Sequence, residues 1–422
     1  MTDFAKLGRK ITLVLFAQQG LASAAFIAAA TLNAIVAADL AGSASLAGVP
    51  AAAYLLAGAF AAGGWGILND TIGRRRALVL GLLIGAVGSG VAFFAIAARS
   101  FLGFLTGMLL MGVANAAVQL ARFIAAEVNL PQARGRAISQ VVLGGTVGSV
   151  IGPFVAGPAG QFFKNFAGDE LAGAYAVSLL LFLVGAVVVF IGLRPDPREI
   201  GRGLSAASPS ASFPASPPAT PVSGHVRSAR EIFRQPAAAV ALTAMVVGQL
   251  VMVLVMVITS LHMKDHQHAL GAISIVISAH TFGMYAFSVV SGQLVDRWGR
   301  GPVIMAGAAM LVLACAAAAV SPDVLPLGVA LFFLGLGWNF CYVGGSTLLA
   351  DQLSPHERAR TQGLNDLLVG LASATGSLSS GLIFAALGYA VMAYVSAALA
   401  LLPLLVTAAW YRARLRAAQA AS

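Results

Sequence analysis

Long apolar segments recur along the whole chain, and this repetition constrains the fold more than any other feature of the sequence. A helix needs about 20 mostly apolar residues to cross the hydrocarbon core of a bilayer. Because helices satisfy all their backbone groups within one span, the sequence predicts an all-α polytopic membrane protein. We count 12 such segments, with approximate bounds at 11–37, 44–68, 77–98, 101–126, 137–163, 172–193, 237–261, 271–295, 302–321, 326–350, 361–386 and 389–411.

Composition and charge agree with this interpretation. Of the 422 residues, 59% are hydrophobic and 9% are charged, whereas a soluble domain has about a quarter charged residues. The net charge of +10 does not indicate nucleic-acid binding, because 21 of the 25 Lys and Arg residues fall on one side of the twelve-span topology. The positive-inside rule makes that side the cytoplasm. We therefore expect a multi-pass protein of the bacterial cytoplasmic (inner) membrane, with both termini in the cytoplasm and the lipid bilayer as its surroundings.

Two markers occur twice at nearly the same offset. The stretches "GILNDTIGRRR" (66–76) and "GQLVDRWGRG" (292–301) share the pattern G-x3-D-x2-G-R at an offset of 226 residues. The stretches "LPQARGRA" (130–137) and "LSPHERAR" (353–360) align at an offset of 224. The sequence therefore predicts a duplicated unit: an N-terminal six-helix half at 1–193, a Ser/Pro/Ala-rich cytoplasmic linker at 194–236, and a C-terminal six-helix half at 237–422.

These motifs and the 6+6 pattern resemble the major facilitator superfamily over nearly the whole chain. The resemblance implies the major facilitator superfamily fold, with 12 transmembrane helices in two six-helix halves that rock about a central site. It also implies a monomer and a transporter rather than an enzyme. A conformational latch in the loops after spans 2 and 8 would comprise Asp70, Gly73, Arg74, Asp296, Gly299 and Arg300.

Spans 7 and 8 carry residue types that bind soft metals. Met252 and Met256 are one turn apart on span 7, and His280 and Met284 are one turn apart on span 8. Each pair lies on one helix face. Methionine in a span is commonly core filling, but an ionisable residue there often marks a transport path. Thioether sulfur and neutral imidazole suit Cu(I) and bind hard cations poorly. We therefore treat these four residues as candidate ligands of a transported metal.

The loop before span 8, "LHMKDHQHAL" (261–270), concentrates the same residue types. Its alternatives are an ordinary polar loop and a periplasmic metal-collection site, whose candidates are His262, Met263, His266 and His268.

The M-x3-M and H-x3-M motifs on consecutive spans resemble the CcoA-like copper importers (CalT family) of the same superfamily. The resemblance implies that Met252, Met256, His280 and Met284 bind copper as the transported substrate. It further implies import of copper, as Cu(I), for assembly of cbb3-type cytochrome oxidase, with no resident cofactor. A Gly-Pro element in span 5, within "LGGTVGSVIGP" (143–153), is a mild argument against import.

Two function classes compete with copper import. In one, the chain is a proton-coupled transporter of a small organic molecule or drug, and the Met and His side chains line an apolar cavity. In the other it is a metal sensor, against which the 6+6 repeat argues. Arg122 and Glu127 near the end of span 4 are candidates for gating or coupling, and we favour a gating pair. The sequence contains no P-loop that would indicate direct use of ATP, and Cys315 and Cys341 lack metal-site spacing.

Overall fold

The computed structural model describes residues 2–130, 133–167, 169–200 and 227–421. These residues form α-helices and one short 3-10 helix, which confirms the predicted all-α membrane fold. Eleven helices in the described ranges are long and apolar enough to cross a membrane. The elements are α1 (Thr2–Ala41), η1 (Ala44–Leu46), α2 (Val49–Ile72), α3 (Arg74–Ala97), α4 (Phe101–Val118), α5 (Ala121–Glu127), α6 (Arg134–Ala167), α7 (Ala172–Gly192), α9 (Ala229–Phe233), α10 (Pro236–Asp265), α11 (Leu270–Tyr285), α12 (Ser288–Trp298), α13 (Arg300–Ala318), α14 (Val324–Ala350) and α15 (Pro355–Ala421).

The difference between eleven helices and twelve predicted spans lies in α15. This helix of 67 residues contains both predicted segments 361–386 and 389–411 and changes direction at Gly388, where φ is 78° and ψ is 173°. Glycine adopts such a positive φ without steric cost. The two predicted spans therefore follow each other without a loop, and the change of direction at Gly388 divides them.

Two predicted spans are interrupted rather than continuous. The segment predicted at 101–126 divides into α4 and α5, and the segment predicted at 271–295 divides into α11 and α12. At the second break, the side-chain amide of Asn339 on α14 donates hydrogen bonds to the Met284 carbonyl at 2.7 Å and to Ser288 Oγ at 3.0 Å. Its oxygen accepts one from Ser291 Oγ. In a membrane, backbone groups freed by a helix break need such partners.

The chain divides into two compact units. The N-terminal unit comprises Met1–Leu32 and Ala53–His225, and the C-terminal unit comprises Asn33–Ala52 and Val226–Ser422. The hairpin 33–52 belongs to the C-terminal unit because it packs on α15, where Ser377 donates a hydrogen bond to the Gly48 carbonyl at 2.8 Å. Most of the predicted linker 194–236, namely 201–226, lies outside the described residues.

Small residues hold the N-terminal unit together. Helix α3 packs on α4 and α7, and α6 packs on α7. Where α3 crosses α4, the Cα of Gly88 faces the Gly107 carbonyl and the Cα of Gly107 faces the Gly88 carbonyl, so neither position has room for a side chain. Gly144 and Gly148 of α6 lie against the backbone of α1 in the same way. Lipid-embedded helices associate by such close backbone approach because the hydrophobic effect does not draw them together.

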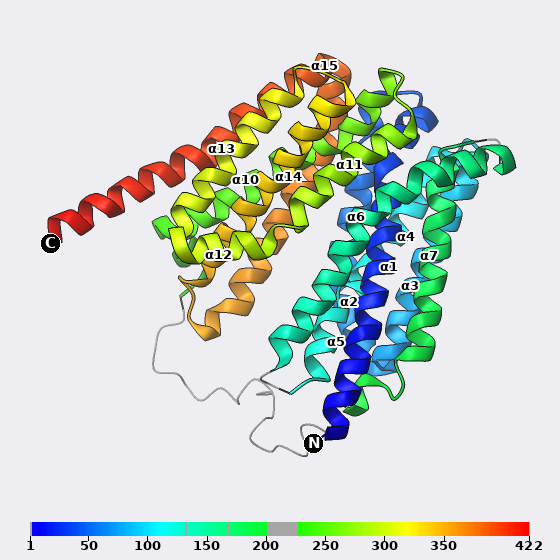
Figure 1. Cartoon of the computed structure of the whole chain (residues 1–422), viewed down its shortest axis with the longest axis horizontal. Coiled ribbons are helices and arrows are strands. Elements are labelled where there is room, and N and C mark those ends of the chain that lie inside the picture. Colours follow the sequence, from blue (N-terminus) through cyan, green and yellow to red (C-terminus); the bar gives the residue numbers. More distant parts are fainter. Residues whose placement is uncertain (1, 131–132, 168, 201–226, 422) are drawn as a thin grey trace. The chain divides into compact units, whose positions relative to one another are not determined.

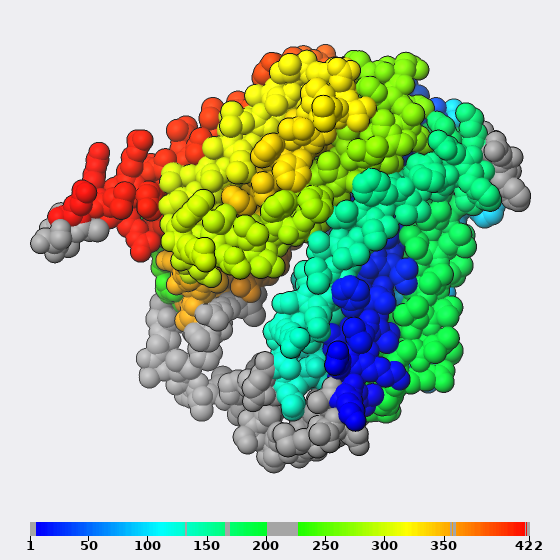
Figure 2. Space-filling model, in the orientation of Figure 1, coloured from blue at the N-terminus to red at the C-terminus, as the bar shows by residue number. Residues whose placement is uncertain are grey.

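Helix α14 is the central element of the C-terminal unit. It packs against α10, α11, α12 and α13, and α10 and α13 also pack against α15 (Figure 1). The last residues of α15, drawn in red, extend beyond the other helices of this unit (Figure 2). Positions 412–416, which include Arg412, Arg414 and Arg416, are exposed there. The arrangement makes α14 the neighbour of both predicted metal-binding helices.

We predict that Gly88→Ala destabilises the N-terminal unit. A methyl group at this position would lie 2.8 Å from the Gly107 carbonyl oxygen and 2.9 Å from Leu110 Cβ, so α3 and α4 have to separate, at a cost of about 1–3 kcal/mol. Gly63→Ala on α2 is the matched control, because nothing lies within 4 Å of its added methyl group. Thermal unfolding of the purified protein in detergent measures both. Equal melting temperatures for the two variants would contradict the close α3–α4 contact.

Candidate functional site

Met245 of α10, on the same helix face as the predicted Met252 and Met256, contacts both α14 and α15. Met245 packs against Gly345 of α14, and its sulfur accepts a hydrogen bond from Asn365 Nδ2 of α15 at 3.7 Å. Met252, two turns further along this face, is 5% exposed, and Met256 is half-buried. The helical periodicity that placed these methionines on one face is therefore consistent with the packing of α10.

His280 and Met284 both lie against α14. His280 is fully buried, and its Nδ1 is 2.9 Å from the carbonyl oxygen of Leu331. A carbonyl only accepts, so Nδ1 carries the proton and Nε2 retains its lone pair. Among the described residues Nε2 has no hydrogen-bond partner. Met284 packs against Gly335, one turn of α14 beyond Leu331.

A second group of side chains, absent from the sequence-based candidates, joins four helices of the same unit. Trp338 of α14 donates its indole N–H to Gln249 Oε1 of α10 at 2.6 Å, and Gln249 Nε2 donates to Ser373 Oγ of α15 at 2.7 Å. Tyr342 stacks on Trp338 with ring centroids 5.1 Å apart and planes at 20°. Tyr285 of α11 meets the same indole edge-on at 6.2 Å. We call Gln249, Tyr285, Trp338, Tyr342 and Ser373 the tryptophan cluster.

The tryptophan cluster is polar, aromatic and only partly buried within membrane-spanning helices. Ser373 is buried, and its four partners are each partly exposed. A buried amide is costly in a membrane unless it is bonded, and here both ends of the Gln249 amide have partners. The hydrogen bond fixes the indole ring in one orientation. The sequence signal for this cluster was Gln249 on the methionine face, together with the aromatic run "WNFCY" (338–342).

The histidine-rich segment divides between the end of α10 and the turn that follows. His262 stacks on Tyr389 of α15 with ring centroids 4.0 Å apart and planes at 2°, and its ring centroid is 4.4 Å from that of His266. Met263 is fully buried, so it faces the helix core rather than the same surface. His268 lies in the turn, where its N–H donates to the Met263 carbonyl at 3.1 Å. The structure therefore brings together two of the four predicted residues.

The residues predicted to form the latch of the N-terminal unit lie around Arg74. Its guanidinium binds Asp70 at 2.6 Å and Glu127 of α5 at 2.9 Å. Gly73 has φ of 90°, a conformation that side-chain-bearing residues rarely adopt. The carboxylate of Asp196 accepts from the backbone N–H groups of Arg74 and Arg75 at 3.4 and 3.1 Å. An acidic side chain at a helix N-terminus is favourable because it satisfies free N–H groups and interacts with the helix dipole.

The duplicated motif forms a related but simpler arrangement in the C-terminal unit. Gly299 has φ of 85°, and Arg300 binds Asp351 at 2.8 Å. Asp351 follows Glu127 by 224 residues, the offset of the second repeat. Arg300 therefore pairs with the repeat equivalent of Glu127, and Asp296 is not among its partners. The carboxylate of Asp351 was not among the sequence-based candidates, although the repeat offset from Glu127 points to it.

The predicted gating pair of Arg122 and Glu127 does not form. Glu127 binds Arg74 instead, and the Arg122 guanidinium lies over the ring of Phe123, 4.9 Å from its centroid. The two residues are five positions apart, so they lie on different faces of α5. Glu127 thus joins Asp70 as a partner of Arg74.

A further ion pair joins the last part of the predicted linker to the start of α15. Arg227 donates to both carboxylate oxygens of Glu357, at 2.9 and 2.7 Å, and to the Gln352 carbonyl at 2.8 Å. The Glu357 side chain is 4% exposed. The Arg227 hydrogen bonds lower the pKa of Glu357 well below its usual range, so the pair persists in acid.

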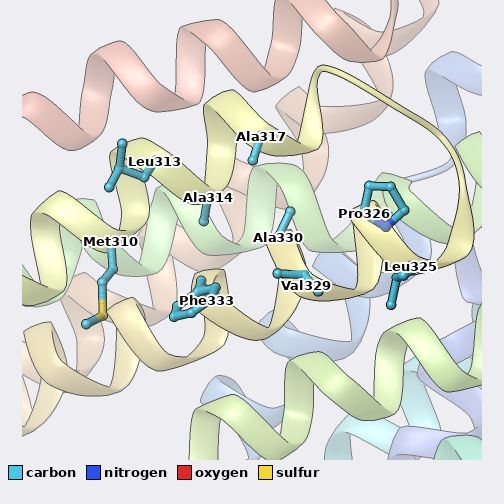
Figure 3. A pocket seen from close by; sticks show the side chains of 9 residues that line it. All are labelled: Met310, Leu313, Ala314, Ala317, Leu325, Pro326, Val329, Ala330 and Phe333. Carbon is cyan, nitrogen blue, oxygen red and sulfur yellow. The ribbon is translucent and has the colours of Figure 1, made fainter.

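The described residues also contain a hollow of about 520 Å³ on the flank of α13 and α14 (Figure 3). Its lining is apolar, with Leu313, Val329 and Phe333 among the labelled side chains. Because it contains none of the polar residues described above, we do not assign the transport site to it. Among all the residues that the structure describes, no group of three or more His, Cys, Asp or Glu side chains is placed to hold a metal ion.

We predict that Glu357→Gln lowers the melting temperature near neutral pH by several degrees. A depressed carboxyl pKa stabilises the folded state above the unfolded-state pKa of about 4.3, and this stabilisation is lost as the pH falls toward the folded-state pKa. The difference between parent and variant should therefore narrow below about pH 4.3. Glu231→Gln is the control, because Gln also serves in the Ser228 capping box. A pH-independent difference would contradict the ionic role of Glu357.

Comparisons with known proteins agree with this architecture. The model of the Major Facilitator Superfamily matches residues 14–267 and 240–421. The chain is 34% identical over 411 residues to the uncharacterized MFS-type transporter YdeG of Bacillus subtilis (strain 168), covering 97% of this chain and 93% of that protein. It is 28% identical over 418 residues to the riboflavin transporter RfnT of Brucella anthropi, covering 96% and 97%.

Solved structures agree on the fold. The nucleoside transporter NupG superposes with a TM-score of 0.69 at 17% identity, covering 96% of this chain and 99% of that one. A bacterial homologue of the human lysosomal transporter Spinster, in an inward-facing conformation, gives a TM-score of 0.71 at 16% identity, with 95% and 96% covered. The duplicated latch motif, the all-helical fold and these matches show that the chain is a membrane protein of the Major Facilitator Superfamily.

Proposed function

We propose that this chain is a secondary-active transporter of a small organic molecule with a planar aromatic ring system, and that the tryptophan cluster binds that ring. The proposal rests on the placement of the Trp338 side chain. Its indole lies in the middle of a membrane-spanning helix, remains partly exposed, and is held in one orientation by Gln249. A fixed aromatic face binds a flat ring by stacking, at about 0.5–1.5 kcal/mol beyond the area that is buried.

The cluster combines the features of a small-molecule site. Such sites are mostly apolar and aromatic, with a few placed polar groups. Here Trp338, Tyr342 and Tyr285 supply aromatic surface, and the Gln249–Ser373 pair supplies amide and hydroxyl groups. The residues come from α10, α11, α14 and α15, so a motion of any of these helices alters the cluster. Alternating access requires that a site respond to helix motion in this way.

The relatives support an organic substrate. RfnT, which aligns with nearly the whole chain, is named a riboflavin transporter, and riboflavin contains a planar three-ring system. We therefore choose riboflavin as the first probe. The absence of a P-loop in the sequence agrees with transport that is driven by an ion gradient rather than directly by ATP.

The distribution of Lys and Arg supports a location in the bacterial cytoplasmic membrane with both termini in the cytoplasm. We propose that the transporter works there as a monomer, as expected from its superfamily.

We expect cells that express the chain to accumulate labelled riboflavin faster than cells with an empty vector. Trp338→Leu should reduce this rate at least tenfold, and Gln249→Leu should reduce it less, because the indole then loses its anchor but keeps its ring. Trp298→Leu, at the end of α12, is the matched tryptophan control and should retain the parental rate. Membrane abundance of each variant is measured alongside.

Two results would count against this proposal. The first is a competition result: an excess of unlabelled riboflavin, or of another planar heterocycle, fails to reduce the uptake of any labelled compound that the protein transports. In the other, Trp338→Leu and Trp298→Leu transport equally well.

Copper import is the second candidate. It is favoured by the Nε2 lone pair of His280, which is buried and has no partner among the described residues, and by Met284 one turn further on the same helix. Met252 and Met256 lie on α10, and both α10 and α11 pack on α14. Three thioethers and an imidazole suit Cu(I), which in this proposal is the substrate that supplies cbb3-type oxidase assembly.

Uptake of radiolabelled copper separates the two candidates. A copper importer requires that Met252→Ala and His280→Ala each lower copper accumulation at least tenfold, with riboflavin uptake unaffected. Met310→Ala on α13, outside both motifs, controls for the loss of a membrane methionine. Parental copper accumulation in Met252→Ala and His280→Ala would exclude copper as the substrate.

A further inference from the structure

The end of α10 presents two imidazole rings side by side. His262 lies in the last turn of α10 and His266, four residues later, is its C-cap residue, with the two ring centroids 4.4 Å apart and the planes at 66°. Paired histidines at this spacing are an established metal-binding arrangement on helices. Met263, between them in sequence, is fully buried and does not share this surface.

The ring nitrogens of the pair are available for a metal. His266 Nδ1 is 2.8 Å from the His262 carbonyl oxygen, so Nδ1 carries the proton and Nε2 keeps its lone pair. Metal-binding histidines characteristically donate their second ring N–H to a carbonyl in this way, which fixes the tautomer and the ring orientation. His262 has no hydrogen bond from either ring nitrogen within the described ranges. Its ring plane is instead held parallel to Tyr389, 4.0 Å away.

The Tyr389 ring has its own support. Tyr389 is 4% exposed, and its hydroxyl shares a hydrogen bond of 2.8 Å with Thr259 of α10. The residue follows Gly388, where α15 changes direction. The imidazole of His262 therefore stacks on a tyrosine ring that is itself held in place. Because His262 is already ordered, a metal ion that binds it loses little free energy in fixing its orientation.

The ring separation is compatible with both imidazoles binding one metal ion. A metal–nitrogen bond of about 2.0–2.1 Å puts the metal about 3.2 Å from each ring centre. Two ligands at 90° then have ring centres about 4.5 Å apart, and two ligands at the tetrahedral angle have them about 5.2 Å apart. The observed 4.4 Å corresponds to the 90° arrangement. Cu(II) and Ni(II) adopt that arrangement in nitrogen-rich sites, whereas Zn(II) prefers the tetrahedral one.

We propose that His262 and His266 form a two-histidine binding site for a divalent transition metal that favours ligands at 90°, Cu(II) or Ni(II), with water in the remaining positions. The site is independent of the tryptophan cluster and of the thioether residues, and it does not depend on which substrate the chain transports. A metal held there links α10, through the His262–Tyr389 stack, to the bend in α15.

Titration calorimetry on the full-length protein, purified in detergent through a tag without histidine, tests the site with NiCl2. We expect one Ni(II) per chain, weaker binding of Zn(II), and no heat with Mg(II). His262→Phe keeps an aromatic ring against Tyr389 but removes the ligand nitrogens, and it should weaken Ni(II) binding at least tenfold. His266→Ala should do the same, and His268→Ala, the matched control in the adjacent turn, should bind within twofold of the parent.

Electron paramagnetic resonance of the Cu(II)-loaded protein counts the nitrogen ligands directly. The parent and His268→Ala should show coupling to two nitrogens, and His262→Phe should show coupling to one at most. Melting temperatures without metal establish that each variant is folded. Parental Ni(II) affinity in both His262→Phe and His266→Ala, or an equal loss in His268→Ala, would overturn the proposal.

Discussion

The structure depends on the requirement that every backbone N–H and C=O group inside the membrane find a hydrogen-bond partner within the protein. Unbroken helices meet this requirement by themselves, and most of the spans are of this kind. Where a span is interrupted, a side chain has to replace the missing backbone bond. Asn339 does this at the junction of α11 and α12. The tryptophan cluster lies next to this junction, because Trp338 precedes Asn339 in the sequence and Tyr285 is the last residue of α11.

The two halves share a sequence motif but not all of its contacts. In both, a glycine with positive φ lets the chain turn at once from one helix into the next, and the following arginine binds a carboxylate from a later span. In the N-terminal half Asp70 and Asp196 add further bonds. Duplication thus preserves the turn and one ion pair, and the surrounding contacts have diverged.

Hydrophobic segments and repeated motifs were sufficient to predict the fold, because span length and backbone satisfaction are properties of local sequence. The sequence also predicted which residues share a helix face, and Met252, Met256, His280 and Met284 remain candidates on those grounds. It did not predict the tryptophan cluster, because Gln249, Trp338 and Ser373 are far apart in the chain and meet only through helix packing. Glu127 was assigned to Arg122 for the same reason: its true partner, Arg74, lies on another helix.

The break between α11 and α12 has a mechanical consequence. Bending a continuous helix breaks backbone hydrogen bonds that nothing nearby can replace, so a straight span resists changes of angle. At this junction the Ala286 N–H still donates to the Phe282 carbonyl and the Ser291 N–H to the Phe287 carbonyl. The Met284 carbonyl, in contrast, accepts from the side-chain amide of one residue on α14, which also donates to Ser288 Oγ. A side-chain amide can rotate and exchange partners without unwinding any helix. The geometry of this junction thus depends in part on the neighbouring helix, through the side chain of residue 339.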